Sequence, residues 1–195
     1  MITADQIKRF APSAMPGVIA AITAHPDAIE IAGLTKPLRI QHFMAQIAVE
    51  SMGLTRLEEN LSYSAKRLTQ VWPKRFPSIA SATGYAYNPR ALAEKVYGGR
   101  LGNTHPGDGW TYRGSGLMQT TGRSNFAAAG HESDPDTLRQ PVGALLSALK
   151  FWTDHACNAI ADTDNLTRLR ITINGGTNGI DDAKIWLAKA KKVFA

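Results

Sequence analysis

The chain has 195 residues, of which 44% are hydrophobic and 19% are charged. This composition predicts a folded globular protein and excludes a disordered or collagen-like chain. The length predicts one domain, residues 1–195, or one domain with two lobes. One cysteine, Cys157, excludes a disulfide framework and a multi-cysteine zinc site. The 22 Lys and Arg exceed the 16 Asp and Glu, so the formal net charge is +6, which favours polyanionic partners such as nucleic acid, anionic lipid or bacterial cell wall.

The N-terminal sequence carries no targeting pattern. No basic region is followed by a long apolar run near Met1, and no stretch of about 18 apolar residues occurs anywhere. The sequence therefore predicts neither a secretory signal peptide nor a membrane span.

Helix signals dominate the chain and predict a mostly α fold. Thr3 and Gln6 form a capping-box pattern, which predicts a short helix that ends before Pro12. Similar start and stop signals predict helices at about 16–25, from Pro37 towards a stop at Gly53, from Ser64 to before Pro73, from Asn88-Pro89 to Gly98, and at about 142–160 and 181–193. Residues 170–173 are the only short strand candidate.

The segment from Gly98 to Gly122 differs from the rest because it holds eight glycines and few helix signals. A long irregular stretch inside a compact domain is usually functional. A turn-rich surface loop is the alternative, but this segment also contains four large or polar side chains that favour a function, namely Trp110, Tyr112, Arg113 and Gln119.

Glu50 lies on the apolar side of the predicted helix after Pro37. It follows Phe43 by seven residues and Ile47 by three, spacings that place it on nearly the same face. A carboxylate that loses water in such a place shifts towards its protonated form, and a carboxylic acid that stays protonated near neutral pH can act as a general acid. The alternative is a glutamate at the helix end that reaches solvent or pairs with an arginine such as Arg56.

Two more carboxylates, Glu58 and Glu59, follow shortly after Gly53. Glycoside hydrolysis needs two carboxyl groups on separate elements, because one protonates the leaving oxygen while the other activates water or attacks the sugar. On their own, Glu58 and Glu59 are better explained as a solvated acidic turn.

Four segments together resemble the glycoside hydrolase family 19 domain in its short phage and bacterial form. They are AQIAVES at 45–51, EENLSYSA at 58–65, YGGRLGNTHPGDGWTYRGSGLMQTTGRSNF at 97–126 and INGGTNG at 173–179. The resemblance runs from about residue 3 to residue 190. It implies a lysozyme-like, two-lobed helical fold with a cleft and a long glycine-rich active-site loop. It also implies inverting hydrolysis of a β-1,4-glycosidic bond, and we expect no cofactor and no metal.

The resemblance assigns roles to particular residues. Glu50 matches the general acid, and Glu59, which directly precedes Asn60 and Leu61, matches the base that activates water; Glu58 is the alternative base. Thr121 matches the hydroxyl residue that holds this water. The residues expected to bind sugar are Tyr63, Trp110, Tyr112, Arg113, Gln119 and Asn174.

For three of these residues a structural role is the alternative. Trp110 and Tyr112 could pack beneath the loop, and Asn174, which precedes two glycines, could form a turn. The chain also departs from the usual family pattern at Val49, Ser115 and Thr120. These departures leave both carboxylates in place and bear on subsite preference rather than on the reaction.

The resemblance favours an endolysin that cleaves bacterial peptidoglycan, a lysozyme-type hydrolase acting on glycan strands. The alternatives are a chitinase and a non-catalytic basic protein that binds the cell wall. The basic residues look scattered and no nucleic-acid-reading motif accompanies them, so nucleic acid is not an expected partner.

The basic C-terminal residues predict a solvated helix face, with weak contact to an anionic membrane as the alternative reading. They are Lys184, Lys189, Lys191 and Lys192. We expect a monomer that is made in the host bacterial cytoplasm without a signal peptide and acts on the cell wall in the periplasm after holin-type release.

Overall fold

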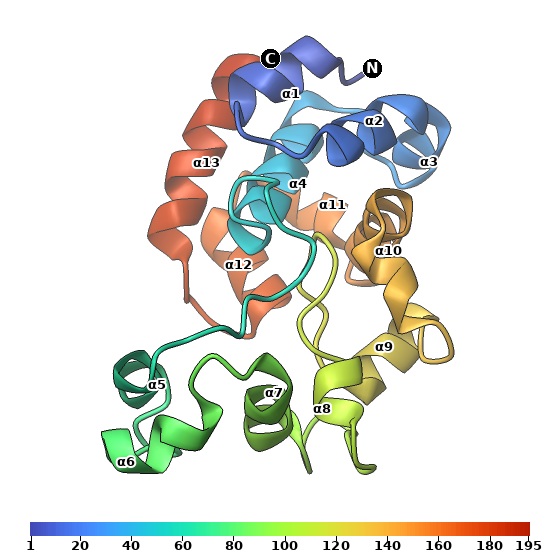
Figure 1. Ribbon diagram of the computed structural model, residues 1–195. Helices are drawn as coiled ribbons and strands as arrows, with labels where there is room; N and C mark the ends of the chain where they lie inside the picture. The colour runs from blue at the N-terminus through green and yellow to red at the C-terminus, as the bar shows by residue number, and fades with distance from the viewer. The chain divides into compact units, whose positions relative to one another are not determined.

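The computed structural model describes residues 1–195 and is mostly α, as the sequence predicts (Figure 1). Two isolated β-bridges, Glu58 with Ser115 and Ser115 with Thr120, are the only extended pairing. None of the helices combines the length and the apolar character that a transmembrane span needs. The α-helices are α1 (Ala4–Phe10), α2 (Pro16–Ala24), α3 (Pro26–Ile31), α4 (Pro37–Glu50), α5 (Ala65–Val71), α6 (Ile79–Ala82), α7 (Pro89–Tyr97), α8 (Asp108–Thr111), α9 (Arg123–Ala129), α10 (Pro141–Asp154), α11 (Cys157–Ala161), α12 (Leu166–Asn174) and α13 (Ile180–Val193), and the 3-10 helices are η1 (Thr83–Tyr85) and η2 (Pro135–Arg139).

The chain folds into two compact units. Unit 1 consists of Met1–Leu57, Gly116–Gln119 and Asp136–Ala195. Unit 2 consists of Glu58–Ser115 and Thr120–Pro135. Each unit has its own hydrophobic core, so each is described by itself.

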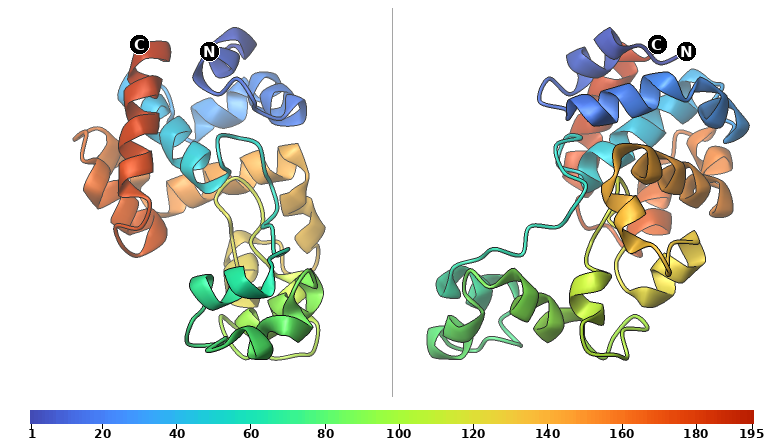
Figure 2. Two further views of the ribbon diagram at one scale, coloured as in Figure 1. Left: turned by 60° about the vertical axis from the view of Figure 1, so that its left-hand side comes forward. Right: turned by 45° about the vertical axis from the view of Figure 1, so that its right-hand side comes forward.

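The core of unit 1 is built around α4, whose residues 41–48 are all buried. α4 packs along α13, and Figure 2 shows the two helices side by side. Phe43 of α4 meets Trp152 of α10 edge-on, with ring centroids 5.4 Å apart. Gln6 of α1 donates from Nε2 to the carbonyl oxygen of Val193 at 3.3 Å, which holds the two termini at the same end of the unit.

The core of unit 2 is smaller and lies between α5, α6 and α7. Its fully buried side chains include Leu68, Phe76 and Leu92. α8 packs against α7 at Gly109, where an added Cβ atom would lie 2.6 Å from the carbonyl oxygen of Ala93. Only glycine permits this approach, so the glycine-rich segment is fixed against a helix rather than projecting into solvent.

Side-chain caps begin the helices where the sequence predicts them. Thr3 and Gln6 form the complete capping box of α1, Ser64 accepts from the backbone N–H of Arg67, and Asn88 accepts from that of Ala91. Each cap satisfies a backbone donor that the first helical turn leaves unpaired. These local predictions are confirmed.

Two element predictions are wrong. The helix predicted at 142–160 is broken into α10 and α11 at Ala156, whose φ is 50° and ψ is 34°. The strand predicted at 170–173 lies inside α12, because Asn165 caps the helix start and Gly175 takes the left-handed conformation at its end. Helices α3, α6, α8, α9 and α12 were not predicted.

Candidate active site

Glu50 is the last residue of α4 and belongs to unit 1. The helix ends there because the Ser51 hydroxyl donates to the carbonyl oxygen of Ile47 and accepts from the N–H of Leu54 at 3.0 Å. Gly53 continues the turn with φ of 75°. The Glu50 side chain retains 18% of its surface exposed, so a largely buried carboxylate stands at the end of a rigid helix.

Arg170 of α12 is the charged partner of Glu50. Its Nη1 donates to Glu50 Oε1 at 2.5 Å and to Gln46 Oε1 at 3.2 Å, and its Nε donates to the carbonyl oxygen of Asn178 at 2.7 Å. The Arg170 side chain is only 3% exposed. The arginine that pairs with Glu50 is therefore a buried one from α12, not Arg56.

Glu59 belongs to unit 2 and is held by three hydrogen bonds. The Tyr97 hydroxyl lies 2.7 Å from Oε1 and 2.8 Å from Oε2 of Glu59, so its proton is shared between the two oxygens. The N–H of Gly114 donates to Oε2 at 3.3 Å, and the N–H of Glu59 donates to the carbonyl oxygen of Gly114 at 2.8 Å. A tyrosine at the end of α7 and the glycine-rich segment thus fix both the backbone and the carboxylate.

Burial controls the protonation of Glu59. Loss of hydration raises the pKa of Glu59 above its ordinary value, while the Tyr97 hydroxyl, the Gly114 N–H and the charge of Arg113 act in the opposite direction. Burial, followed by the neighbouring Glu59 charge, raises the pKa of Tyr97. Tyr97 therefore stays protonated and acts as a hydrogen-bond donor to the carboxylate.

Glu58 lies in a different environment from Glu59. Its side chain is 43% exposed and forms an ion pair with Arg113, whose Nε donates to Oε1 at 2.6 Å. Arg113 is buried, and its guanidinium carbon lies 3.8 Å from the centroid of the Trp110 ring. Trp110 is half-buried in α8 and also has the guanidinium of Arg90 5.7 Å from its centroid.

The two units divide the predicted site residues between them. Unit 1 carries Glu50, Gln119 and Asn174; unit 2 carries Glu59, Tyr63, Trp110, Tyr112, Arg113 and Thr121.

Three of the predicted residues are half-buried polar side chains. The Gln119 amide donates to the carbonyl oxygen of Gly116 at 3.0 Å. Tyr63 lies edge-on to Trp72, with centroids 5.5 Å apart. Thr121 lies two residues before the start of α9, and its carbonyl oxygen accepts from the Asn125 amide at 2.8 Å.

Tyr112 and Asn174 occupy the structural roles that the sequence left open. Tyr112 is 4% exposed, packs edge-on against Phe126 and donates its hydroxyl to the carbonyl oxygen of Glu132. Asn174 ends α12 and donates from its amide to the carbonyl oxygen of Asn178, which closes the turn over the two glycines. The structure thus gives Tyr112 a core contact and Asn174 a turn contact.

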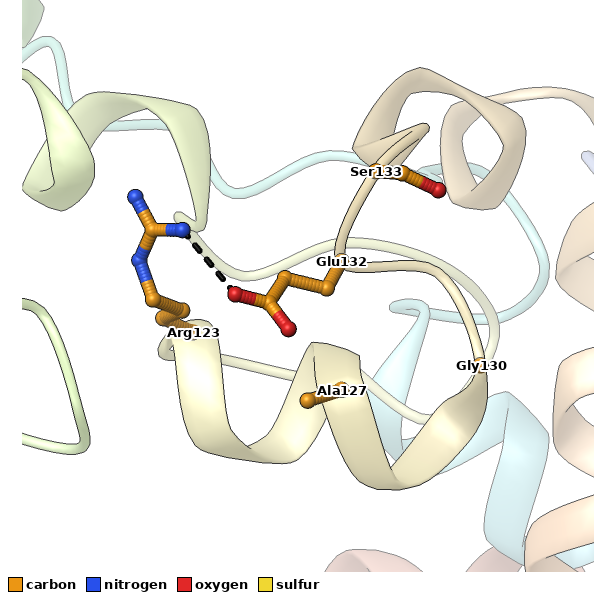
Figure 3. Close-up of a pocket in the computed structure, with 5 residues that line it drawn as sticks. All are labelled: Arg123, Ala127, Gly130, Glu132 and Ser133. Carbon is orange, nitrogen blue, oxygen red and sulfur yellow. Dashed lines mark hydrogen bonds and ion pairs between the residues drawn. The ribbon is translucent and has the colours of Figure 1, made fainter.

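Unit 2 also has a surface hollow, two of whose lining residues, Arg123 and Glu132, contact Tyr112. It is lined by Arg123, Ala127, Gly130, Glu132 and Ser133, and Figure 3 shows Arg123 reaching Glu132 across it. Arg123 also forms two hydrogen bonds with buried Asp108, at 2.6 and 3.0 Å, which lower the pKa of Asp108 to about 2. The charges here are already paired, and none of the predicted catalytic residues lines the hollow. No three His, Cys, Asp or Glu side chains are grouped so that they could hold a metal ion.

Sequence reasoning missed Tyr97, Arg170 and Gln46. Tyr97 stands at the start of the glycine-rich segment that carries the family resemblance, but no pattern linked it to a carboxylate 38 residues earlier. A signal for Arg170 existed, because an arginine three residues before Ile173 and beside Leu169 lies on an apolar stripe and needs a buried anion.

Comparison with solved structures defines the class of fold. The crystal structure of chitinase C from Streptomyces griseus aligns with a TM-score of 0.66 and 14% identity, over 99% of this chain and 76% of that chain. A crystal structure of a chitinase C mutant aligns with a TM-score of 0.60 and 16% identity, over the same shares of the two chains. The fold is therefore the lysozyme-like helical fold of chitinase C, which confirms the predicted fold class.

Sequence comparison gives the family. No protein-family model matches the chain. A curated protein of Haemophilus influenzae, described as a glycosyl hydrolase family 19 domain-containing protein, is 36% identical over 189 residues, which cover 93% of this chain and 92% of that protein. The chain belongs to glycoside hydrolase family 19, and it is a glycoside hydrolase.

Proposed function

We propose that this glycoside hydrolase is an endolysin that cleaves the β-1,4-glycosidic bonds of bacterial peptidoglycan by an inverting mechanism. The observation that carries the proposal is a pair of half-buried carboxylates, Glu50 and Glu59, each held in one orientation by donors of its own unit. In this reaction Glu50 protonates the leaving oxygen and Glu59 activates the attacking water. Thr121, whose hydroxyl can both donate and accept, holds that water.

The contacts of Glu59 support it over Glu58 as the base. Glu58 forms an ion pair with Arg113, whereas Glu59 is half-buried and its loss of hydration raises its pKa. A carboxylate with a raised pKa is a stronger base towards water, provided that it is ionised at the working pH. The hydrogen bonds from Tyr97 and Gly114 favour that ionised form.

The contacts of Glu50 support a role as proton donor through one particular oxygen. Oε1 accepts the hydrogen bond from Arg170, and Oε2 accepts none within the chain. A protonated Glu50 would therefore carry its proton on Oε2, while Arg170 keeps the carboxyl group from rotating. Around the reacting bond, Tyr63, Trp110, Arg113, Gln119 and Asn174 are the proposed sugar-binding residues.

The formal net charge of +6 supports peptidoglycan as the substrate, because the bacterial cell wall is acidic. We place the enzyme as a monomer made in the bacterial cytoplasm and released through a holin-type pore to act on glycan strands in the periplasm. Weak contact with an anionic membrane would involve Lys189 and Lys192, since Lys184 and Lys191 already pair with Asp181 and Asp164. Chitin hydrolysis is the second candidate, supported by the structural similarity to chitinase C.

The test compares the wild type with Glu50→Gln, Glu59→Gln and Glu58→Gln, where the last is a matched control. The substrates are purified Gram-negative peptidoglycan and a soluble chitin oligomer, with products identified by mass spectrometry and their anomeric form followed by NMR. We expect the wild type to release muropeptides with an inverted α-anomer, Glu58→Gln to keep most of this activity, and the other two variants to be nearly inactive. Preferential cleavage of chitin would contradict the peptidoglycan assignment, and wall binding without hydrolysis would contradict the catalytic one.

A second measurement separates the two catalytic roles. Azide added to a Glu59→Ala variant can replace the activated water, so a glycosyl azide of inverted configuration should form if Glu59 is the base. Azide should give no such product with Glu50→Ala, because that variant retains its base and lacks the proton donor. The reverse pattern would exchange the roles of the two residues.

A further inference from the structure

The excess positive charge of the chain is confined to one stretch of unit 2. Residues 64–104, which we name the basic segment, contain seven of the 22 Lys and Arg but only one of the 16 Asp and Glu. This segment therefore accounts for the whole formal net charge of +6, and the other residues carry equal numbers of both signs. The net positive charge is therefore concentrated in this segment, because acidic residues equal the basic ones in number elsewhere in the chain.

The cations of the basic segment have no carboxylate partners. Its single acid, Glu94, accepts hydrogen bonds from the N–H groups of Gly107 and Trp110 at 3.2 and 2.8 Å, which fixes the start of α8. The cations contact neutral groups instead. Among these contacts, Arg67 donates to the Gln70 amide oxygen and Arg75 to the carbonyl oxygen of Lys95. The exposed members of the set are Lys66, Arg67, Lys74, Arg90, Lys95 and Arg100.

Most cations in the rest of the chain pair with a carboxylate, as nine of the other 15 Lys and Arg do. Arg39 and Lys36 share Asp162, Lys150 pairs with Asp154, and Lys191 pairs with Asp164. In the basic segment none of the seven Lys and Arg has such a partner, which leaves its exposed cations available to a ligand with several negative charges.

The basic segment is attached to the candidate active site through α7. This helix ends at Tyr97, whose hydroxyl contacts Glu59. It also carries Arg90, whose guanidinium lies 5.7 Å from the ring of Trp110, a proposed sugar-binding residue. Because one short helix fixes both groups, the unpaired Arg90 stands close to the place where a glycan would meet Glu59, and the other cations of the basic segment belong to the same unit.

We propose that the basic segment binds the carboxylates of the peptide stems that peptidoglycan carries, and so favours stem-bearing glycan over uncharged glycan. The proposal rests on the proposed function for its substrate. Chitin has no carboxylates and gains nothing from these cations. Exposed ion pairs are weak singly and are screened by salt, so several contacts must act together and the preference must fall as ionic strength rises.

A lipid surface is the competing partner for exposed cations. Ile79 and Tyr87 of the basic segment are 56% and 71% exposed and could enter a bilayer interface. However, α5 has seven residues and α6 has four, so neither forms the long amphipathic face with which helices lie in a membrane surface. The attachment to α7 favours the stem carboxylates, and vesicles are included in the test.

The test uses a triple variant, Lys66→Gln, Arg67→Gln and Lys74→Gln, and a control with the same change of net charge, Lys8→Gln, Lys189→Gln and Lys192→Gln. All six side chains are exposed and none forms an ion pair within the chain. Binding is measured by co-sedimentation with phosphatidylglycerol vesicles and with purified sacculi whose stem carboxylates are intact or converted to amides. Hydrolysis is measured on stem-bearing glycan and on glycan freed of stems by an amidase.

We expect the wild type and the control to bind intact sacculi about tenfold more tightly than amidated sacculi at low salt. This value assumes that each of three exposed ion pairs tightens binding by about a factor of two. The basic-segment variant should lose most of this difference, as should the wild type at about 0.5 M salt. The kcat/KM on stem-bearing glycan should fall in parallel, with little change on stem-free glycan.

Three outcomes overturn the proposal: equal binding to both kinds of sacculi, equal losses in the basic-segment variant and the control, or loss of binding only to phosphatidylglycerol vesicles. Failure of the proposed function is distinguishable. Carboxylate-dependent binding without hydrolysis would refute the endolysin function and retain the stem contact. Hydrolysis of glycan at the same rate with and without stems would retain the endolysin function and refute the stem contact.

Discussion

Replacing Arg170 by alanine should destabilise unit 1 strongly, because it leaves Glu50 and Gln46 without their donor. Removing one partner of a buried ion pair costs about 3–5 kcal/mol, and the 18% exposure of Glu50 places this cost near the lower end. The buried Gln46 oxygen loses its hydrogen bond at about 1–3 kcal/mol. The carbonyl of Asn178 is on an exposed residue and can bind water instead. The total is about 4 kcal/mol.

Thermal and urea unfolding of the wild type and three variants test this value. At this chain length about 4 kcal/mol corresponds to a fall in Tm of about 8–16 °C. Combining Arg170→Met with Glu50→Leu should recover much of the loss, because two apolar side chains leave no unpaired charge. Glu50→Gln alone should lose less than Arg170→Ala, since its amide oxygen still accepts from Arg170. A Tm for Arg170→Ala within about 2 °C of the wild type would refute the reasoning, and so would a double variant no more stable than Arg170→Ala.

Three further predictions concern single residues. Burial raises the folded-state pKa of Glu59 above 4.5, so the ionised carboxylate lowers the stability of the folded protein at pH values above that raised pKa. Glu59→Gln should therefore have a higher Tm than the wild type at pH 7 and lose this advantage near pH 4. A lower Tm at pH 7 would contradict the prediction. Burial lowers the pKa of His42 below 6.5, so the unfolded chain binds the proton more readily and stability should fall as pH drops from 7 to 5; urea midpoints should show a flatter dependence for His42→Gln. Ala156 holds a left-handed conformation at φ of 50°, which glycine adopts at lower cost than alanine. Ala156→Gly should therefore raise the free energy of unfolding by about 0.5–1 kcal/mol, measured by the urea midpoint. A loss of stability would show that the turn is not strained.

The fold was predictable where a short-range signal decides the structure. The caps at Thr3, Ser64 and Asn88 act through hydrogen bonds to residues three positions away, so the sequence alone contains them. Residues 170–173 misled because β-branched side chains there favour a strand. The cap at Asn165, the stop at Gly175 and the tertiary bonds of Arg170 decide for a helix instead.

The candidate site was predictable only as far as residue types and motifs reach. Glu50 and Glu59 were predicted from an apolar helix face and a family resemblance. Their partners were not, because Arg170 is 120 residues from Glu50 and Tyr97 is 38 residues from Glu59. Tyr112 is an aromatic residue of the type that binds sugars, but its side chain packs against Phe126 in the interior. Contacts at such separations depend on the assembled fold, which no local pattern encodes.

Unit 1 is built from separate segments of the chain, so its parts leave the ribosome at different times. α4 is synthesised early, yet the helix that packs along it, α13, and the arginine that holds Glu50 come more than a hundred residues later. Unit 2 needs nothing beyond Pro135. A nascent chain can therefore complete the surroundings of Glu59 while Glu50 still lacks its partner, so the two carboxylates are both in place only when translation has passed α13. Synthesis itself would then keep this glycoside hydrolase inactive on the ribosome.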